Sequence, residues 1–328
     1  MRIAALLPHV EIYGGVRRYL EIGNELTRRG HYFVLFHPEG SQPEWLEFKG
    51  LIQPLSSLTK ESFDIGLCSE YSLLPYYEKL NARAKFFYFL LAGHRQEKEV
   101  IKKDFYFIGN SEGICRRIKR KYRRSCYKAA GGVNSQIFYP LPREGKKDEF
   151  RILAYGRLHK KRKGTRYVIR AVERLYRKCP YLKLLLFDSL VGKEKKDPRQ
   201  QIKTRVPFEF YLNLPQEKMA WLYSQADLFV SAEWRAGWSN TTAEAMACRR
   251  PVVCTRSGTA DFAFHSQTAL ISPWPFPFFL SRQIEKLIKD KELRQSLAQA
   301  GYEKIRAFTW KVVADNLEEI FQQVAKLK

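Results

Sequence analysis

The chain has no pair of cysteines at the spacing of a metal site or a redox motif. Its six cysteines lie far apart, with no C-x-x-C sequence and no matching Cys/His spacing. This distribution argues against a zinc site and against a disulfide framework, and it is typical of a reducing compartment. We therefore expect a cytoplasmic protein without a structural metal.

A long apolar run is also missing. The longest one, FFYFLLAG (Phe86 to Gly93), is well short of the about 20 residues that span a bilayer, and it fits a buried strand. The N-terminal sequence MRIAALLPHV has one basic residue and too short an apolar run for a signal peptide. We expect a soluble protein, or one that is peripheral at the inner face of a membrane.

Acidic residues are few relative to basic ones. The 34 Asp and Glu residues face 58 Lys and Arg residues, which gives a formal net charge of +24. Such a field favours anionic partners: nucleic acid, acidic lipid surfaces or phosphorylated small molecules. The 328 residues, 45% of them hydrophobic, are enough for two domains with separate cores and exclude a disordered chain.

The first half alternates apolar strands with amphipathic helices. A buried strand is predicted at Arg2–Leu7, followed by a loop with Gly14 and Gly15, a helix that ends at Gly30, and a strand at Tyr32–Phe36. Paired glycines allow a close approach of the backbone to a ligand, although tight turns use them too. Further strands are predicted at Phe63–Leu67, Lys85–Leu91, Phe105–Gly109 and Tyr127–Ala130, with a helix capped by Asn110 and Ser111 that runs through Tyr122.

A second half repeats this α/β pattern after a linker. The linker is predicted from Gly131 to Asp148, a stretch rich in glycine, proline and charge. Strands then follow at Arg151–Tyr155, Leu182–Phe187, 205–212, Ala226–Val230, Pro251–Cys254 and Ala269–Ile271, and helices at Thr165–Lys178, Pro215–Ser224, Phe279–Lys289, Lys291–Phe308 and Trp310–Lys326. We expect two Rossmann-like, doubly wound parallel-sheet domains, 1–145 and 146–309, that face each other across a cleft, with the helix at 310–328 packed back on the first.

One helix is unusually basic. Residues from Arg116 to Lys128 include eight Lys or Arg and no acidic residue. Such a run is commonly a solvated face, but without a counter-charge it also fits contact with an acidic surface.

Two loops of the second half carry candidate chemistry. Arg157 and Lys163 lie in a basic loop between a strand and a helix, which suits a diphosphate, although a solvated basic loop is equally compatible. The stretch from Ala226 to Cys254 is a βαβ unit with Gly237 in its turn. On local sequence, Thr241-x-x-Glu244 is a capping box.

Together these motifs resemble the family-4 retaining glycosyltransferases of the GT-B fold. The resemblance rests on an ordered set of segments that covers nearly the whole chain: GGVRRYLEIGNELTRRGH (14–31), AAGGVNSQIFYP (129–140), GRLHKKRKGTRYVIRAVERL (156–175), GWSNTTAEAMACRRPVVC (237–254) and FTWKVVADNLEEIF (308–321). Each segment alone is degenerate. Their order and spacing make the resemblance specific.

The resemblance implies roles for particular residues. Arg157 and Lys163 would hold the donor diphosphate and stabilise the leaving group, and Glu244 would bind the donor ribose. Residues near the diphosphate would be Thr241 and Thr242, with Gly237 and Asn240 in the same donor-binding turn. In the first domain, Gly14 and Gly15 would close over the donor phosphates, and His94 would lie near the donor sugar as a catalytic candidate, although a lone histidine is commonly structural.

Two positions depart from the family pattern. The carboxylate eight residues before Glu244 is replaced by Ala236, and Glu233, three residues earlier, is the nearest acidic alternative. Arg249 stands where the family usually has the glycine of a left-handed helix cap. The first departure puts the identity of the sugar, and to a lesser degree catalysis, in question.

The sequence therefore predicts a retaining, metal-independent glycosyltransferase. It would use a nucleoside-diphosphate sugar, no cofactor, and a glycan or lipid-linked acceptor in surface polysaccharide or lipopolysaccharide synthesis. No D-x-D pair follows a predicted strand, so a metal-clamped diphosphate is not expected. The alternatives are a catalytically impaired glycosyltransferase-like subunit, which Ala236 suggests, and a basic nucleic-acid-binding protein. No nucleic-acid motif supports the latter.

Overall fold

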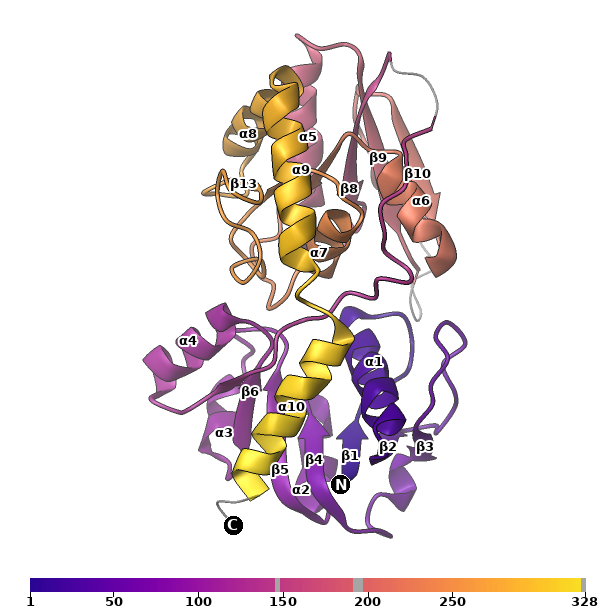
Figure 1. The fold of residues 1–328 in the computed structure, drawn as a ribbon, viewed down its shortest axis with the longest axis vertical. Coiled ribbons are helices and arrows are strands. Elements are labelled where there is room, and N and C mark those ends of the chain that lie inside the picture. Colours follow the sequence, from indigo (N-terminus) through magenta and orange to yellow (C-terminus); the bar gives the residue numbers. More distant parts are fainter. Residues whose placement is uncertain (145–147, 191–196, 326–328) are drawn as a thin grey trace. The chain divides into compact units, whose positions relative to one another are not determined.

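The chain forms two compact units in a computed structural model that describes residues 1–144, 148–190 and 197–325 (Figure 1). Unit 1 comprises Met1–Gly132 and Phe308–Lys328, and unit 2 comprises Val133–Ala307. The boundary predicted between residues 145 and 146 falls in a stretch outside the described residues, as does the end of the predicted C-terminal helix at 326–328.

Unit 1 is built on a parallel sheet with the order β3-β2-β1-β4-β5-β6-β7. Its described strands are β1 (Arg2–Leu6), β2 (Tyr32–His37), β3 (Leu51–Pro54), β4 (Phe63–Cys68), β5 (Ala82–Phe89), β6 (Tyr106–Gly109) and β7 (Tyr127–Lys128). Its described helices are α1 (Gly14–Arg28), α2 (Leu74–Lys79), α3 (Glu97–Lys102), α4 (Glu112–Tyr122) and α10 (Trp310–Ala325).

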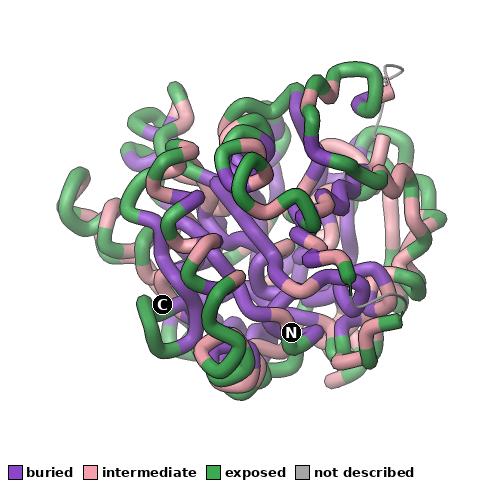
Figure 2. The backbone as a smooth tube through the Cα atoms, turned by 90° about the horizontal axis from the view of Figure 1, so that it is seen from above, coloured by how far each residue is buried: buried purple, intermediate pink, exposed green. Residues whose placement is uncertain are grey.

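Strand β1 contributes to a core on each face of this sheet. Ile3 and Ala5 belong to the core shared with α1 and α10, whereas Ala4 and Leu6 belong to the core on the opposite face. Alternate side chains of a strand point to opposite faces, so a strand covered on both sides is apolar throughout. The central strands β1 and β2 are accordingly buried beyond their first residues. Figure 2 shows the burial of the backbone along the chain.

The C-terminal helix returns to unit 1 and packs beside α1 (Figure 1). Acidic residues of α10 contact basic residues at and just after the end of α1. Arg29 pairs with Asp315 at 2.8 Å and also with Glu318, and Glu318 Oε1 lies 2.6 Å from His31 Nε2. The return of the chain over the first unit therefore uses ion pairs as well as the apolar face of α10.

Unit 2 repeats the doubly wound arrangement, with the strand order β10-β9-β8-β11-β12-β13. Its described strands are β8 (Phe150–Tyr155), β9 (Leu182–Asp188), β10 (Phe208–Leu212), β11 (Leu228–Ser231), β12 (Val252–Cys254) and β13 (Leu270–Ile271). Its described helices are α5 (Thr165–Tyr176), α6 (Met219–Ser224), α7 (Asn240–Ala247), α8 (Pro277–Lys289) and α9 (Lys291–Ile305).

The prediction of two Rossmann-like parallel-sheet domains is confirmed, but some local details were wrong or missed. The edge strand β3 and the six-residue helices α2 and α3 have too few residues to show a periodic pattern. The predicted helix start at Asn110–Ser111 is correct, since the Ser111 hydroxyl accepts a hydrogen bond from the Ile114 amide. Arg249 has the left-handed backbone expected of its position, with φ of 54°.

Candidate functional site

The order in which the chain adds strands to the sheet of unit 2 reverses between β8 and β11. From β8 the chain continues on one side to β9 and β10, and it later returns on the other side to β11. Ligands of doubly wound sheets bind in the crevice beyond the carboxyl ends of the strands at such a switch point. The loops that follow β8 and β11 are therefore the expected place for a ligand site.

These two loops are held against each other. The Trp234 amide donates to the carbonyl of Arg162 at 3.2 Å, and its indole Nε1–H donates to the carbonyl of Lys161 at 3.2 Å. Gly164 packs so closely on the end of β11 that a Cβ there would lie 2.7 Å from the carbonyl carbon of Ala232. The basic loop is thus fixed in place by backbone contacts and is not a loosely solvated segment.

Tyr155, the last residue of β8, brings the two predicted diphosphate ligands together. Its ring centroid lies 5.3 Å from Arg157 Cζ and 5.3 Å from Lys163 Nζ. A cation over an aromatic face at this distance is attracted by the ring quadrupole. Tyr155 was not predicted as a site residue, although its position at the end of an apolar strand, next to the basic loop, was a usable signal.

Arg157 is buried and oriented by the end of the neighbouring strand. Its Nε donates to Asp188 Oδ1 at 2.9 Å, and its Nη2 donates to the carbonyl of Ser189 at 2.6 Å. Burial raises the pKa of the Asp188 carboxyl, and the guanidinium beside it acts in the opposite direction. Burial and the nearby Asp188 also raise the pKa of Tyr155 well above its ordinary value. The role of Asp188 was not predicted, because nothing local links β9 to the loop after β8.

Lys163 also has a carboxylate partner. Its Nζ pairs with Glu233 Oε1, and Glu233 Oε2 accepts a hydrogen bond from Ser239 Oγ at 2.7 Å. Ser239 Oγ lies in turn 2.8 Å from Thr242 Oγ1. A continuous polar array therefore crosses the carboxyl ends of β9, β8 and β11 and reaches the start of α7.

The helix α7 begins earlier than the capping-box interpretation requires. Its N-cap is Ser239 and its first residue is Asn240, so Thr241 lies inside the first turn and the predicted Thr241–Glu244 capping box is wrong. Glu244 Oε2 instead accepts a hydrogen bond from the Tyr223 hydroxyl at 2.9 Å, and this hydroxyl is also 3.2 Å from the carbonyl of Thr241. Tyr223 was not anticipated from the sequence.

The turn before α7 contains Ala236, which stands where the resemblance predicts a carboxylate. The Ala236 amide donates to Ser257 Oγ at 2.8 Å, and the Ser239 amide donates to the carbonyl of Gly258 at 2.8 Å. Gly237 lies between these two anchored residues. The turn is thus fixed by the loop that follows β12, with a methyl group where the family has a carboxylate.

The remaining predicted residues lie in unit 1. Gly14 and Gly15 are the first residues of α1, and a Cβ on Gly15 would be 3.2 Å from Leu90 Cδ1. His94 stacks on Tyr71 with ring centroids 3.9 Å apart and an interplanar angle of 15°. The structure therefore assembles the unit 2 residues around one switch point, and it places these three on unit 1.

The loop of His94 is anchored by a buried carboxylate. Glu97 accepts hydrogen bonds from the Gly93 amide, from the Tyr122 hydroxyl at 2.6 Å and from Arg117 at 3.0 Å. Burial acts to raise the pKa of Glu97, but these hydrogen bonds outweigh it and lower the pKa from its ordinary value. Glu97 therefore connects the segment of His94 to the basic helix α4.

The predicted absence of counter-charges in the basic run is wrong. Glu97 pairs with Arg117 and lies 3.9 Å from Lys121, while Glu112 pairs with Arg116 at 3.4 Å. The sequence did not show this, because Glu97 precedes the run and Glu112 lies one helical turn before it. Four cations share the exposed face of α4 and its C-cap at helical spacing: Arg116, Lys119, Arg120 and Arg123.

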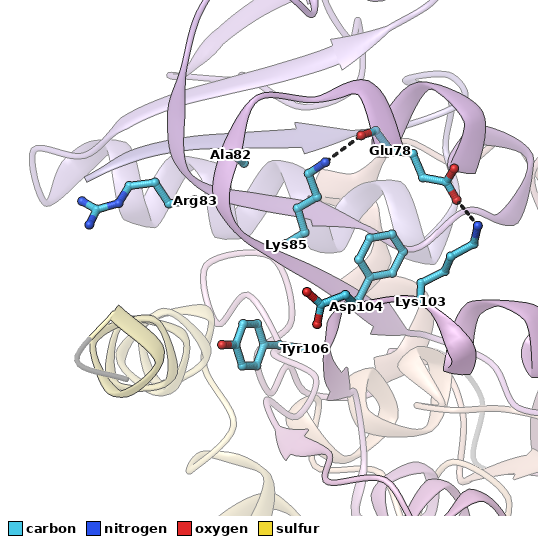
Figure 3. A pocket seen from close by; sticks show the side chains of 8 residues that line it. Glu78, Ala82, Arg83, Lys85, Lys103, Asp104 and Tyr106 are labelled. Atoms are coloured by element: carbon cyan, nitrogen blue, oxygen red, sulfur yellow. Dashed lines mark hydrogen bonds and ion pairs between the residues drawn. The ribbon is translucent and has the colours of Figure 1, made fainter. Parts of the chain in front are cut away.

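A separate pocket of about 500 Å³ opens in unit 1 (Figure 3). Residues at the start of β5 and just before β6 line it, so it lies at the amino ends of these strands. Lys85 Nζ donates to the carbonyl of Glu78 at 2.7 Å, and Lys103 Nζ is 2.7 Å from Glu78 Oε1. The pocket is at the opposite sheet edge from the carboxyl ends, and its charges are mixed, so we do not assign it the main chemistry.

In the part of the chain that the structure describes, no three His, Cys, Asp or Glu side chains are grouped as they would be around a metal ion. Within the same residues, no helix combines the length and apolar character that crossing a membrane requires.

Comparison with known proteins gives a consistent family. Residues 141–304 match the model of the glycosyl transferases group 1. The capsular polysaccharide biosynthesis glycosyltransferase CapM of Staphylococcus aureus is 26% identical over 182 residues, which are 55% of this chain and 47% of the relative. A D-inositol 3-phosphate glycosyltransferase of Corynebacterium diphtheriae is 27% identical over 114 residues, which are 34% of this chain and 27% of the relative. The matches thus span less than half of these relatives.

Solved structures are similar over the whole chain. A sucrose-phosphate synthase from Thermosynechococcus elongatus superposes with a TM-score of 0.79 at 17% identity and covers 100% of both chains. Anabaena HepE, solved in complex with UDP and glucose, superposes with a TM-score of 0.78 at 15% identity, covering 98% of this chain and 100% of that one. At this identity the likeness establishes the fold, which is GT-B.

Proposed function

The chain belongs to the glycosyl transferases group 1, and we propose that it is a retaining, metal-independent enzyme that moves a sugar from a nucleoside-diphosphate sugar to a glycan or lipid-linked acceptor. The observation that carries this proposal is the convergence of Arg157 and Lys163 on Tyr155 at the switch point of unit 2. The similarity to a capsular polysaccharide glycosyltransferase supports the acceptor class that we propose.

The charges of the site suit the leaving group of this reaction. As the bond between the sugar and the diphosphate breaks, positive charge develops on the sugar and negative charge on the departing diphosphate. Cations that are already in place stabilise that charge without reorganisation. Arg157 is oriented by Asp188 and Ser189, and Lys163 by Glu233. In our proposal these two cations take the part that a metal ion plays in other glycosyltransferases.

The donor nucleoside would lie along α7. The first-turn amides of a helix have no acceptor within the helix and attract anions, so a phosphate group of the donor would lie near Asn240, Thr241 and Thr242. Glu244, one turn further, would accept hydrogen bonds from ribose hydroxyls. The Tyr223 hydroxyl fixes the orientation of its carboxylate.

A nucleotide screen tests the donor class. We expect the melting temperature to rise with the diphosphate of one base among UDP, GDP and ADP, because at 100 times Kd binding stabilises the folded protein by about 2.7 kcal/mol. Glu244→Gln should weaken that nucleotide roughly tenfold, since a hydrogen bond to a charged group contributes about 1.5–3 kcal/mol, and should leave pyrophosphate binding unchanged. Glu285→Gln, on a half-buried carboxylate of α8 that pairs with Lys289, is the control. A chain that responds to none of the three nucleotides would contradict the proposal.

We further propose that the exposed cations of α4 dock the protein on an anionic membrane surface, where a lipid-linked acceptor would be found. Each cation near an acidic leaflet contributes about 1 kcal/mol. Reversing Lys119, Arg120 and Arg123 to Glu should therefore weaken binding to vesicles containing phosphatidylglycerol by at least roughly 100-fold in a pelleting assay.

The control for this test is an equal change of charge elsewhere. Arg166, Arg170 and Arg177 are exposed along α5 and its C-cap in unit 2. Their reversal to Glu should leave vesicle binding within a fewfold of the unmodified protein. Equal losses in both variants would mean that net charge, and not the face of α4, drives the interaction.

The substitution at Ala236 favours one other function, that of a catalytically impaired glycosyltransferase-like subunit. Such a subunit would bind the nucleotide in the screen above but would neither hydrolyse nor transfer the sugar of the matching donor. Measuring the slow hydrolysis of that donor by the purified protein separates the two.

A further inference from the structure

Glu233 is a buried carboxylate with both oxygens engaged. It follows the end of β11, and the residue is 3% exposed. Oε1 pairs with Lys163 Nζ, and Oε2 accepts the hydroxyl of Ser239 at 2.7 Å. A carboxylate held at both oxygens has one orientation, and a buried charge is tolerated only when it is paired in this way.

The backbone of Glu233 is fixed from the next strand of the sheet. Its carbonyl accepts a hydrogen bond from Thr255 Oγ1, and Thr255 directly follows β12. The Thr255 carbonyl accepts in turn from Thr259 Oγ1 at 2.7 Å. Glu233 is therefore held at its main chain by the residue that follows β12 and at its side chain by Lys163 and Ser239.

Lys163 depends on such an attachment. Its ammonium is a compact charge at the end of four flexible methylene groups, without the planar fork that orients an arginine. The ring of Tyr155 and the carboxylate of Glu233 both hold this ammonium. Arg157 is constrained in a parallel way by Asp188.

We propose that Glu233 is a positioning residue that holds Lys163 at the place where the diphosphate departs. The proposal rests on the function proposed above and adds a role to it. It also separates Glu233 from the carboxylate that the family has at position 236, because both oxygens of Glu233 are committed to Lys163 and Ser239. The sugar side of the site is then left with the methyl group of Ala236.

The test is a split between binding and turnover in Glu233→Gln. Removing one negative charge beside Lys163 should leave the affinity for the nucleoside diphosphate equal or higher, as measured by calorimetry with UDP, GDP and ADP. The kcat for hydrolysis of UDP-, GDP- or ADP-glucose should fall roughly 10- to 100-fold, because a displaced catalytic group costs about that much. Glu233→Asp, which keeps the charge, should recover part of the lost kcat.

Two further variants provide a second test of this role and a control. Ser239→Ala removes the partner of Oε2 and should lower kcat in the same direction with nucleotide affinity retained. Asp227→Asn breaks an ion pair with Arg143 at the amino end of the same strand and should leave both constants unchanged.

The inference and the proposed function fail in different ways. If the unmodified protein binds none of the three nucleotides, the proposed function is wrong. Suppose that the unmodified protein binds and turns over a donor. Glu233 does not position Lys163 if Glu233→Gln then keeps the kcat of the unmodified protein. The same conclusion holds if Glu233→Gln loses both nucleotide affinity and kcat in proportion to a lower melting temperature.

Discussion

Lys163→Ala should lower the kcat of sugar transfer by about 10²- to 10³-fold, the loss expected when one preorganised donor to a developing negative charge is removed. Lys163 is a better target than Arg157. Either removal leaves a buried carboxylate, Asp188 or Glu233, without its cation, but the Arg157 side chain is only 7% exposed, so its loss also removes buried packing and threatens the fold more. The side chain of Lys163 is 20% exposed. The effect should be measured on the donor that the nucleotide screen identifies.

A double variant and a neighbouring lysine serve as controls for this prediction. Lys163→Ala leaves the Glu233 carboxylate without its cation, and this negative charge should weaken nucleotide binding. The double variant Lys163→Ala and Glu233→Gln removes both charges. It should therefore recover nucleotide binding but not kcat. Lys160→Ala removes the same charge from an exposed position of the same loop and should change kcat by less than a fewfold. Equal losses at residues 160 and 163 would show that the loop acts only through its total charge.

Gly164→Ala should destabilise the protein by about 2–5 kcal/mol, the sum of two contributions. Its backbone has φ of 71°, which costs an L-residue about 1–2 kcal/mol. In addition, the new Cβ would overlap the backbone of Ala232, and overpacking of this kind costs about 1–3 kcal/mol. The displaced loop should also separate Lys163 from Glu233, so kcat should fall in the fraction that remains folded.

Gly30→Ala is the matched control for the steric part of this effect. Gly30 has a similar backbone, with φ of 83°, but no atom lies within 4 Å of the position that its Cβ would occupy. Gly30→Ala should therefore lower the free energy of unfolding only by the cost of the left-handed backbone, about 1–2 kcal/mol, and the activity should be unaffected. Melting followed by circular dichroism compares the two variants, and equal shifts would show that the contact with Ala232 is unimportant.

Much of the architecture could be predicted because its determinants are local. Buried parallel strands appear as short apolar runs, and glycines interrupt them where the chain turns. The elements that were missed, β3, α2 and α3, are those too short to repeat a period. The capping box was wrongly assigned because Ser239, two residues before Thr241, also has a side chain that suits an N-cap.

The sequence by itself determined the basic loop after β8, the glycine that ends it, and the polar start of α7. Only the tertiary structure decided how these groups are paired. Asp188 and Glu233 lie 31 and 70 residues from their partners Arg157 and Lys163, and no local pattern connects them. The strand order places the carboxyl ends of β9, β8 and β11 side by side, so two buried carboxylates meet two cations there. Buried charges require partners, and the order of strands in the sheet determines which partners are within reach.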